Sequence, residues 1–187
     1  MAKPKNQDLE YVARAEKMNW KALRRLWKDI QRGNTPDWDG GKALEHLVVR
    51  AFQLSDLKAE YPYDVPPGGK PLEQIDGLVR LDFVTFLIEC KDKDTVDIEV
   101  IAKLRNQLLR RPDTTLGCVF TTGDFTLPAL TLTDFSVPHR ILLWAEVDID
   151  ECLSAEDFQT TLREKYHHLC KFGMTDRSPS YKELNGK

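Results

Sequence analysis

Ionisable side chains follow directly on an apolar strand at one point of the chain. The run Phe83–Ile88 is typical of a central strand that is covered on both faces, and Glu89, Cys90 and Lys91 continue it. Because side chains alternate along a strand, Glu89 and Lys91 project from one face and Cys90 points to the other, into the core. A carboxylate and an ammonium group at the end of such a strand are candidates for chemistry.

A second carboxylate is expected beside this pair. The preceding segment also has strand character, and a tight turn at residues 81–83 joins the two strands. If they pair as a hairpin without a bulge, Asp76 lies nearly opposite Glu89. In the same register, Gln74 lies nearly opposite Lys91. The sequence therefore predicts one cluster of these four side chains.

Two carboxylates with a lysine beside them suit phosphodiester hydrolysis with a divalent metal ion. Asp76 and Glu89 would hold Mg²⁺, for which Mn²⁺ can substitute, while water and a substrate phosphate complete the octahedral shell. The ion polarises the phosphate and lowers the pKa of a bound water. Lys91 would orient that water or neutralise charge in the transition state. The alternative is an ion pair between Glu89 and Lys91 on a sheet edge, without a catalytic role.

Helices and strands alternate along the rest of the chain. Apolar periodicity predicts helices at 8–32, 41–54, 97–111 and 154–171, and strands at 59–65, 73–81, 83–91, 115–121 and 140–144. This order indicates an α/β protein built on a small mixed sheet.

The charge of the chain is unevenly distributed. The net charge is −3, yet residues 1–36 carry nine basic and four acidic side chains, and the remainder has a net charge of −8. Arg24, Arg25 and Lys28 lie mostly off the apolar stripe of the N-terminal helix. They form either the solvated face of a docked helix, a nucleic-acid-binding surface or a dimer arm.

Composition excludes several classes of protein. In a chain of 187 residues with 41% hydrophobic side chains, no apolar run approaches the ~20 residues of a membrane helix, and the start lacks the apolar stretch of a signal peptide. The four cysteines are too widely spaced for a structural zinc site or a disulfide scaffold. These features predict a soluble, cytoplasmic protein without a membrane partner, and Cys90 and Cys118 as core residues.

These motifs together resemble a known family. Asp76 and Glu89-Cys90-Lys91, with 12 residues between the aspartate and the glutamate, resemble the core of PD-(D/E)xK nucleases. The segments 74–79 and 86–92 are more closely similar to Mrr-type restriction endonuclease domains. Residues 41–45, 121–126 and 140–144 resemble further segments of these domains, so that the resemblance covers roughly residues 39–153.

The resemblance implies a fold and a division of the chain. The expected fold is a restriction-endonuclease-like α-β-β-β-α-β core with a mixed central sheet flanked by helices. This core would span residues 37–153. A basic helical extension (1–36) would precede it, and a C-terminal helix with a polar tail (154–187) would follow it.

The family also implies two further site residues. It carries an additional metal-associated glutamate on the first core helix, here Glu45, although the helix dipole alone also explains a carboxylate in a first turn. Gln107 lies in the helix after Lys91, where some members carry a polar residue that faces the site. A solvated glutamine is the alternative there.

The leading hypothesis is a metal-dependent endonuclease that cleaves DNA, or less often RNA, in a defence or repair context, with Asp76, Glu89, Lys91 and Glu45 as catalytic residues. The alternative is a nuclease-fold subunit that binds nucleic acid or a partner without cutting. A third interpretation is an enzyme that acts only after a partner protein or a ligand activates it. A homodimer would supply the two sites that are needed to cut both strands.

Overall fold

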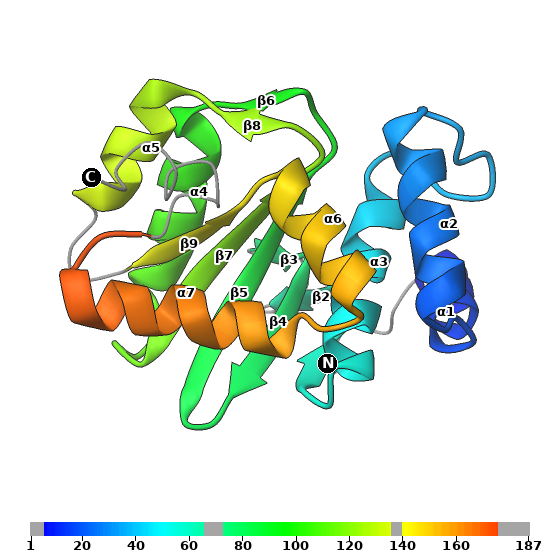
Figure 1. Ribbon diagram of the computed structural model, residues 1–187, viewed down its shortest axis with the longest axis horizontal. Coiled ribbons are helices and arrows are strands. Elements are labelled where there is room, and N and C mark those ends of the chain that lie inside the picture. The colour runs from blue at the N-terminus through cyan, green and yellow to red at the C-terminus, as the bar shows by residue number, and fades with distance from the viewer. Residues whose placement is uncertain (1–5, 66–72, 136–139, 176–187) are drawn as a thin grey trace.

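A five-stranded mixed sheet forms the centre of the structure (Figure 1). The computed structural model describes residues 6–65, 73–135 and 140–175. In order across the sheet, the strands are β1 (Lys58–Glu60), β4 (Gly77–Leu81), β5 (Val84–Lys91), β7 (Thr115–Thr121) and β9 (Ile141–Trp144). The first three are antiparallel and the last three are parallel, so β5 belongs to both parts of the sheet. The predicted mixed sheet, with β5 at its centre, is confirmed.

Helices cover both faces of the sheet (Figure 1). One face packs against α3 (Lys42–Leu54), α6 (Glu146–Ala155) and α7 (Gln159–Phe172), and the other against α4 (Ile98–Leu108) and α5 (Leu127–Asp134). Phe86 and Ile88 of β5 belong to the first core, and Leu87 to the second. This alternation has the consequence that Glu89, two residues after Leu87, faces α4.

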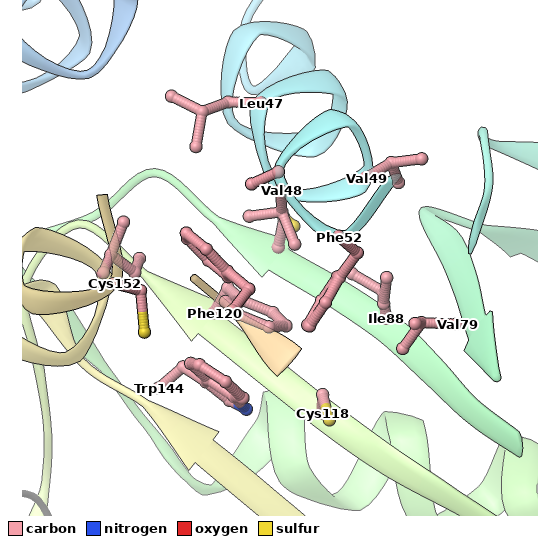
Figure 2. Close-up of a cluster of buried hydrophobic side chains, with 14 of the residues drawn as sticks. Leu47, Val48, Val49, Phe52, Val79, Ile88, Cys118, Phe120, Trp144 and Cys152 are labelled. Atoms are coloured by element: carbon pink, nitrogen blue, oxygen red, sulfur yellow. The ribbon is translucent and has the colours of Figure 1, made fainter. Parts of the chain in front are cut away.

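Aromatic side chains hold the first of these cores together (Figure 2). Phe52 of α3 packs edge-on against Phe120 and Trp144, with ring centroids 5.9 Å apart in each pair. Phe120 and Trp144 stack on each other at 4.9 Å. Such pairs contribute about 0.5–1.5 kcal/mol each beyond the burial of their area. They bind α3 to the sheet, and the N-terminus of α3 is where Glu45 lies.

The hairpin of β4 and β5 has the predicted register. Gly77 faces Ile88 and Leu81 faces Val84. The ladder ends at Gly77, however, because the preceding residues form a separate strand, β3 (Glu73–Ile75), which pairs with β2 (Tyr63–Val65). The expected strand 73–81 is therefore two strands. The residue between them is Asp76.

Three further predictions of single elements are wrong in their extent. The helix predicted at 8–32 is two helices, α1 (Asn6–Glu16) and α2 (Trp20–Gln31), because Asn19 caps a new helix by accepting a hydrogen bond from Ala22 N (3.0 Å). The helix predicted at 154–171 is likewise divided into α6 and α7, with Glu156 in the left-handed region at a φ of 58°. The strand predicted at 59–65 is divided between β1 and β2.

The terminal helices pack on the core. Trp27 of α2 donates a hydrogen bond from Nε1 to Asp150 Oδ1 of α6. Three of the four cysteines, Cys90 and Cys118 among them, are buried as free thiols, as predicted for those two. No helix in the described ranges is long and apolar enough to cross a membrane. The polar tail predicted for the C-terminus lies largely outside the described residues.

Candidate functional site

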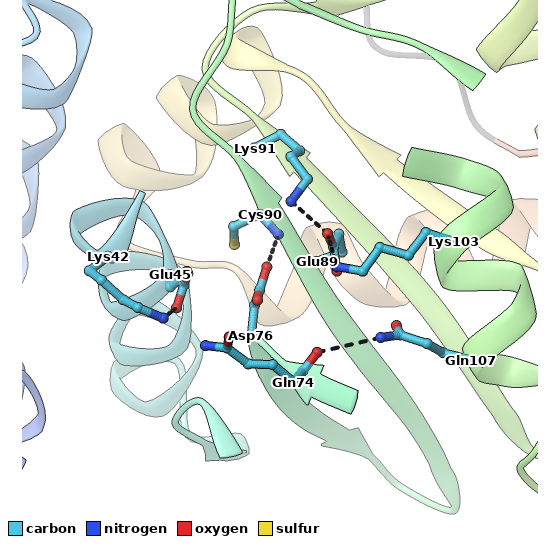
Figure 3. Close-up of polar contacts among 9 residues, drawn as sticks. All are labelled: Lys42, Glu45, Gln74, Asp76, Glu89, Cys90, Lys91, Lys103 and Gln107. Atoms are coloured by element: carbon cyan, nitrogen blue, oxygen red, sulfur yellow. Dashed lines mark hydrogen bonds and ion pairs between the residues drawn. The ribbon is translucent and has the colours of Figure 1, made fainter. Parts of the chain in front are cut away.

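Glu89 and Lys91 meet on the face of β5 that is turned towards α4 (Figure 3). The Glu89 side chain is only 1% exposed, and Lys91 Nζ lies 2.6 Å from its Oε1. Between them, Cys90 is buried in the core on the opposite face. The shared face that strand alternation predicts is therefore present, and it places a carboxylate at a depth where a charge needs a partner.

Asp76 joins the cluster through the break between β3 and β4. Its Oδ2 accepts a hydrogen bond from the backbone N–H of Cys90 (2.9 Å), so it lies beside the end of β5 as the hairpin register predicts. Burial raises the pKa of Asp76, and the negative charge of Glu89 raises it further. Two carboxylates held so closely in a buried place favour a cation between them.

Glu45 reaches the same place from the other layer of helices (Figure 3). It lies in the first turn of α3, where Lys42 Nζ is 2.7 Å from its Oε2. Burial raises its pKa to about 7, and Asp76 contributes to the shift while Lys42 opposes it. The helix dipole alone does not account for this position, because a carboxylate stabilised only by the dipole would have its pKa lowered.

A residue that the sequence analysis did not single out completes the cluster. Lys103 of α4 places its Nζ 2.8 Å from Oε1 and 2.9 Å from Oε2 of Glu89. Lys103 precedes Gln107 by four residues, so the two lie on the same face of one helix. Its position four residues before Gln107 on the predicted helix is the sequence signal that could have identified Lys103 as a site residue.

The two predicted accessory glutamines lie at the edge of the site. Gln107 is buried, and its Nε2 donates to the backbone oxygen of Gln74 at 3.4 Å. The pairing of Gln74 with Lys91 was wrong, because Gln74 is in β3 and faces Asp64 of β2. In Figure 3 its side chain extends away from Lys91. The strand before Asp76, β3, lies outside the main sheet, and this change of sheet separates Gln74 from Lys91.

The loop that follows Lys91 is held by the segment after β7. Thr121 Oγ1 donates to the backbone oxygen of Lys93 (3.0 Å), and Thr122 Oγ1 donates to Asp92 Oδ1 (3.0 Å). A Cβ at Gly123 would collide with the backbone of Asp94, so only glycine permits this approach. The segment 121–126 thus supports the strand end that carries Lys91.

The basic residues of the N-terminal arm have different surroundings. Arg24 forms an ion pair with Glu156 (2.6 Å) and donates to the backbone oxygen of Leu153, both of which attach α2 to the C-terminal part of the chain. Arg25 and Lys28 are exposed. The structure therefore leaves Arg25 and Lys28 accessible to a ligand, while Arg24 already has a partner.

The donor set fits a divalent metal ion with few protein ligands. Asp76 and Glu89 offer carboxylate oxygens, which are the donors that Mg²⁺ prefers, and burial together with the charge of Glu89 raises the pKa of Asp76. Within the described residues, no three histidine, cysteine, aspartate or glutamate side chains form a ready-made metal site.

Comparison with protein families identifies the family of the chain. The model of the restriction endonuclease family Mrr_cat matches residues 39–153, which include the whole cluster. The chain belongs to this family. None of the curated proteins compared with the chain matches it.

Three solved structures are similar to this Mrr_cat chain. The DNA modification-dependent restriction endonuclease AspBHI is 16% identical with a TM-score of 0.50, and the match covers 87% of this chain and 43% of that one. AF1548, a protein of unknown function, is 19% identical with a TM-score of 0.49, covering 71% and 78%. The MspJI restriction endonuclease, in complex with a 27-mer oligonucleotide, is 17% identical with a TM-score of 0.44, covering 97% and 42%. The likeness to AspBHI confirms a restriction-endonuclease-like fold.

Proposed function

We propose that this protein is a divalent-metal-dependent endonuclease that hydrolyses phosphodiester bonds in DNA. The observation that carries the proposal is the buried pair of Asp76 and Glu89 at one strand end, with Lys91 Nζ 2.6 Å from Glu89. The family match supports the nuclease activity. Placing two carboxylates side by side in a buried position costs free energy that a bound divalent ion offsets, and a binding module has no use for such an arrangement.

Each residue of the cluster has a distinct role in this proposal. Asp76 and Glu89 would hold Mg²⁺, or Mn²⁺ in its place, and the ion would supply Lewis acidity at the phosphate. Lys91 orients the attacking water and donates to the charge that develops on the phosphate. Glu45, with a pKa raised to about 7, is able to exchange a proton near neutral pH.

Substrate binding is proposed to extend beyond this cluster. Arg25 and Lys28, which are exposed on α2, would contact phosphates of the nucleic acid, and Arg24 would do so only if it leaves Glu156. Gln107 would help through the position of β3, to whose backbone it is hydrogen-bonded. A homodimer would cut both strands, and a partner protein or ligand would control the activity in a defence or repair setting.

A panel of end-labelled substrates tests the proposal. Single-stranded, duplex and branched DNA and an RNA of the same sequence are incubated with the wild-type protein and Mg²⁺ or Mn²⁺, or with EDTA. We expect cleavage of DNA that EDTA abolishes and that Asp76→Ala abolishes while the circular dichroism spectrum is retained. If the wild-type protein binds DNA but cuts no member of the panel with either metal, it is the non-catalytic nuclease-fold subunit.

A further inference from the structure

Glu89 is held by more positive charge than a catalytic lysine alone supplies. Lys91 contacts one of its oxygens at 2.6 Å, and Lys103 contacts both, at 2.8 and 2.9 Å. The Glu89 side chain is 1% exposed, so it requires a counter-charge while no metal ion is bound. Lys103 supplies that charge from helix α4, whereas Lys91 lies on strand β5 with Glu89 (Figure 3).

The two lysines differ in how freely they can leave Glu89. The Lys91 side chain is 27% exposed and lies on the same strand as its partner, whereas the Lys103 side chain is 50% exposed. A flexible, half-exposed ammonium group changes rotamer readily. Lys103 is therefore the counter-ion that can move.

A divalent ion at Glu89 competes with Lys103 for the same oxygens. An ion that is ligated by Asp76 and Glu89 would approach carboxylate oxygens that the Lys103 ammonium now occupies in a bidentate contact. Two cations at one carboxylate also repel each other strongly at low dielectric. Binding of the metal ion thus requires that Lys103 withdraw.

A polar groove beside Glu89 can receive the withdrawn side chain. This groove, of about 650 Å³, lies between α4 and β3, and Lys103 itself lines it. Asn106, which is exposed, lies farther along the same side of α4 and offers a hydrogen-bond donor, whereas Arg110, which also lines the groove, is paired with Glu73. The acidic Glu73 at its edge is already neutralised by Arg110 and Arg111. Glu99, which is exposed, also lines the groove, so the groups that would contact a phosphate are the Lys103 ammonium and the Asn106 amide farther along α4.

We propose that Lys103 is the counter-ion that a divalent metal ion displaces from Glu89, and that its released ammonium group then binds a phosphate of the substrate strand in the groove between α4 and β3. This inference rests on the proposed metal-dependent nuclease and adds an order of events to it. Metal binding exposes a positive charge for the substrate, so metal and nucleic acid bind cooperatively.

Metal binding without nucleic acid provides the first test. Mn²⁺ is titrated calorimetrically into the wild-type protein and into Lys103→Met, Lys103→Gln and Lys103→Arg, after the thermal unfolding of each variant has shown that it is folded. Because the ion no longer has to displace a competing positive charge, Mn²⁺ binding is expected to tighten about tenfold in the Met and Gln variants. The Arg variant keeps the charge, and its affinity should remain near that of the wild-type protein.

Lys93→Met is the matched control. Lys93 is an exposed lysine two residues after Lys91, and its side chain makes no ion pair with any residue that the structure describes. Its replacement removes the same charge close to the site without freeing Glu89. We expect the Mn²⁺ affinity of Lys93→Met to equal that of the wild-type protein. If Lys93→Met and Lys103→Met change the affinity equally, the cause is a general electrostatic effect.

Oligonucleotide binding provides the second test. The affinity for a labelled duplex 20-mer is measured by anisotropy with Ca²⁺, at several salt concentrations, on samples in which a gel shows the duplex to be intact. Lys103→Met should reduce the slope of log affinity against log salt by about 0.9, the value for one lost phosphate contact on duplex DNA. Lys93→Met should leave the slope unchanged.

The outcomes separate the inference from the proposed function. If the wild-type protein binds Mn²⁺ and Lys103→Met and Lys103→Gln bind it no more tightly, the displacement is overturned while the nuclease proposal stands. An unchanged salt slope in Lys103→Met would overturn the phosphate contact. If the wild-type protein binds no Mn²⁺ at millimolar concentration, the metal-dependent nuclease itself fails.

Discussion

One buried ionic site lies at the end of β5 and another lies between α6 and α7, and the two differ in how their charges are balanced. At the strand end, Glu89 has two lysine partners and lies beside Asp76, whose pKa is raised. Between α6 and α7, Lys165 and Asp148 form a pair at 3.0 Å, with side chains 3% and 5% exposed. Asp148 also accepts a hydrogen bond from Ala145 N (2.8 Å) at the start of α6.

The difference separates an ion pair that maintains the fold from a cluster that is prepared for a ligand. Asp148 connects α6 to α7 through one cation and caps a helix, so its charge is compensated within the protein. The strand-end carboxylates repel one another, and one of the two lysines that pair with Glu89, Lys103, is half-exposed. Groups with perturbed pKa values in such an arrangement cluster at functional sites.

The largest expected effect is the loss of cleavage on replacement of Lys91. Lys91→Ala should lower the cleavage rate about a thousandfold, because a donor aimed at the charge of the transition state is lost. Glu89 keeps its bidentate contact with Lys103, so the free energy of unfolding should fall by less than about 1 kcal/mol. Single-turnover cleavage and urea denaturation measure the two effects. Cleavage at the wild-type rate would refute the assignment of Lys91.

Replacement of Lys165 should have the opposite profile. Lys165→Met leaves the Asp148 carboxylate buried without its partner at 3.0 Å, which should lower the free energy of unfolding by about 3 kcal/mol. The cleavage rate per folded molecule should not change. The double variant with Asp148→Asn should recover part of the lost stability, since no buried charge remains. A stability loss below about 1 kcal/mol would show that this pair is not the structural counterpart of the cluster.

The pH dependence of stability distinguishes the strand-end cluster further. Glu45 has a pKa of about 7 in the folded protein and 4.5 ordinarily, so between these values the folded state binds the proton more tightly. In the metal-free protein, Glu45 therefore stabilises the fold at low pH, and this contribution is lost as the pH rises from about 5 to 8, by about 2 kcal/mol.

The difference between the wild-type protein and Glu45→Gln isolates this term, because His46 acts with the opposite sign. Burial lowers the pKa of His46 to about 4, so it destabilises the fold as the pH falls below 6.5. Urea denaturation of both proteins from pH 5 to pH 8 gives the difference. If the two curves are parallel, Glu45 does not titrate in this range.

The smallest effect is expected from the exposed charges of α2. Arg25→Glu combined with Lys28→Glu should weaken the binding of duplex DNA about tenfold at low salt and less at high salt, because these contacts are with phosphates only. The cleavage rate at saturating DNA should not change, unlike that of Lys91→Ala. Lys58→Glu combined with Lys171→Glu, at two exposed lysines of β1 and α7, changes the net charge by the same amount and is the control. Equal losses in both would assign the effect to net charge.

Local pattern predicted much of the fold and part of the site. Alternation along β5 placed Glu89 and Lys91 on one face, and the hairpin register placed Asp76 beside them. The register did not extend to Gln74, because the chain leaves the sheet at Asp76 and pairs with β2 instead. The division of the N-terminal helix was missed because the capping residue Asn19 starts a new helix within a continuous apolar stripe.

The sequence by itself determined that Glu89 and Lys91 project from the same face of β5, because residues two apart on a strand always share a face. The family resemblance predicted Glu45, but only the tertiary structure decided that Glu45 and Lys103 lie beside these residues from opposite layers of helices. Glu45 depends on the packing of α3 against the aromatic core, and Lys103 depends on which face of the sheet α4 covers between the parallel strands β5 and β7. That choice follows from the handedness of the crossover connection and from long-range packing, which no local periodicity records.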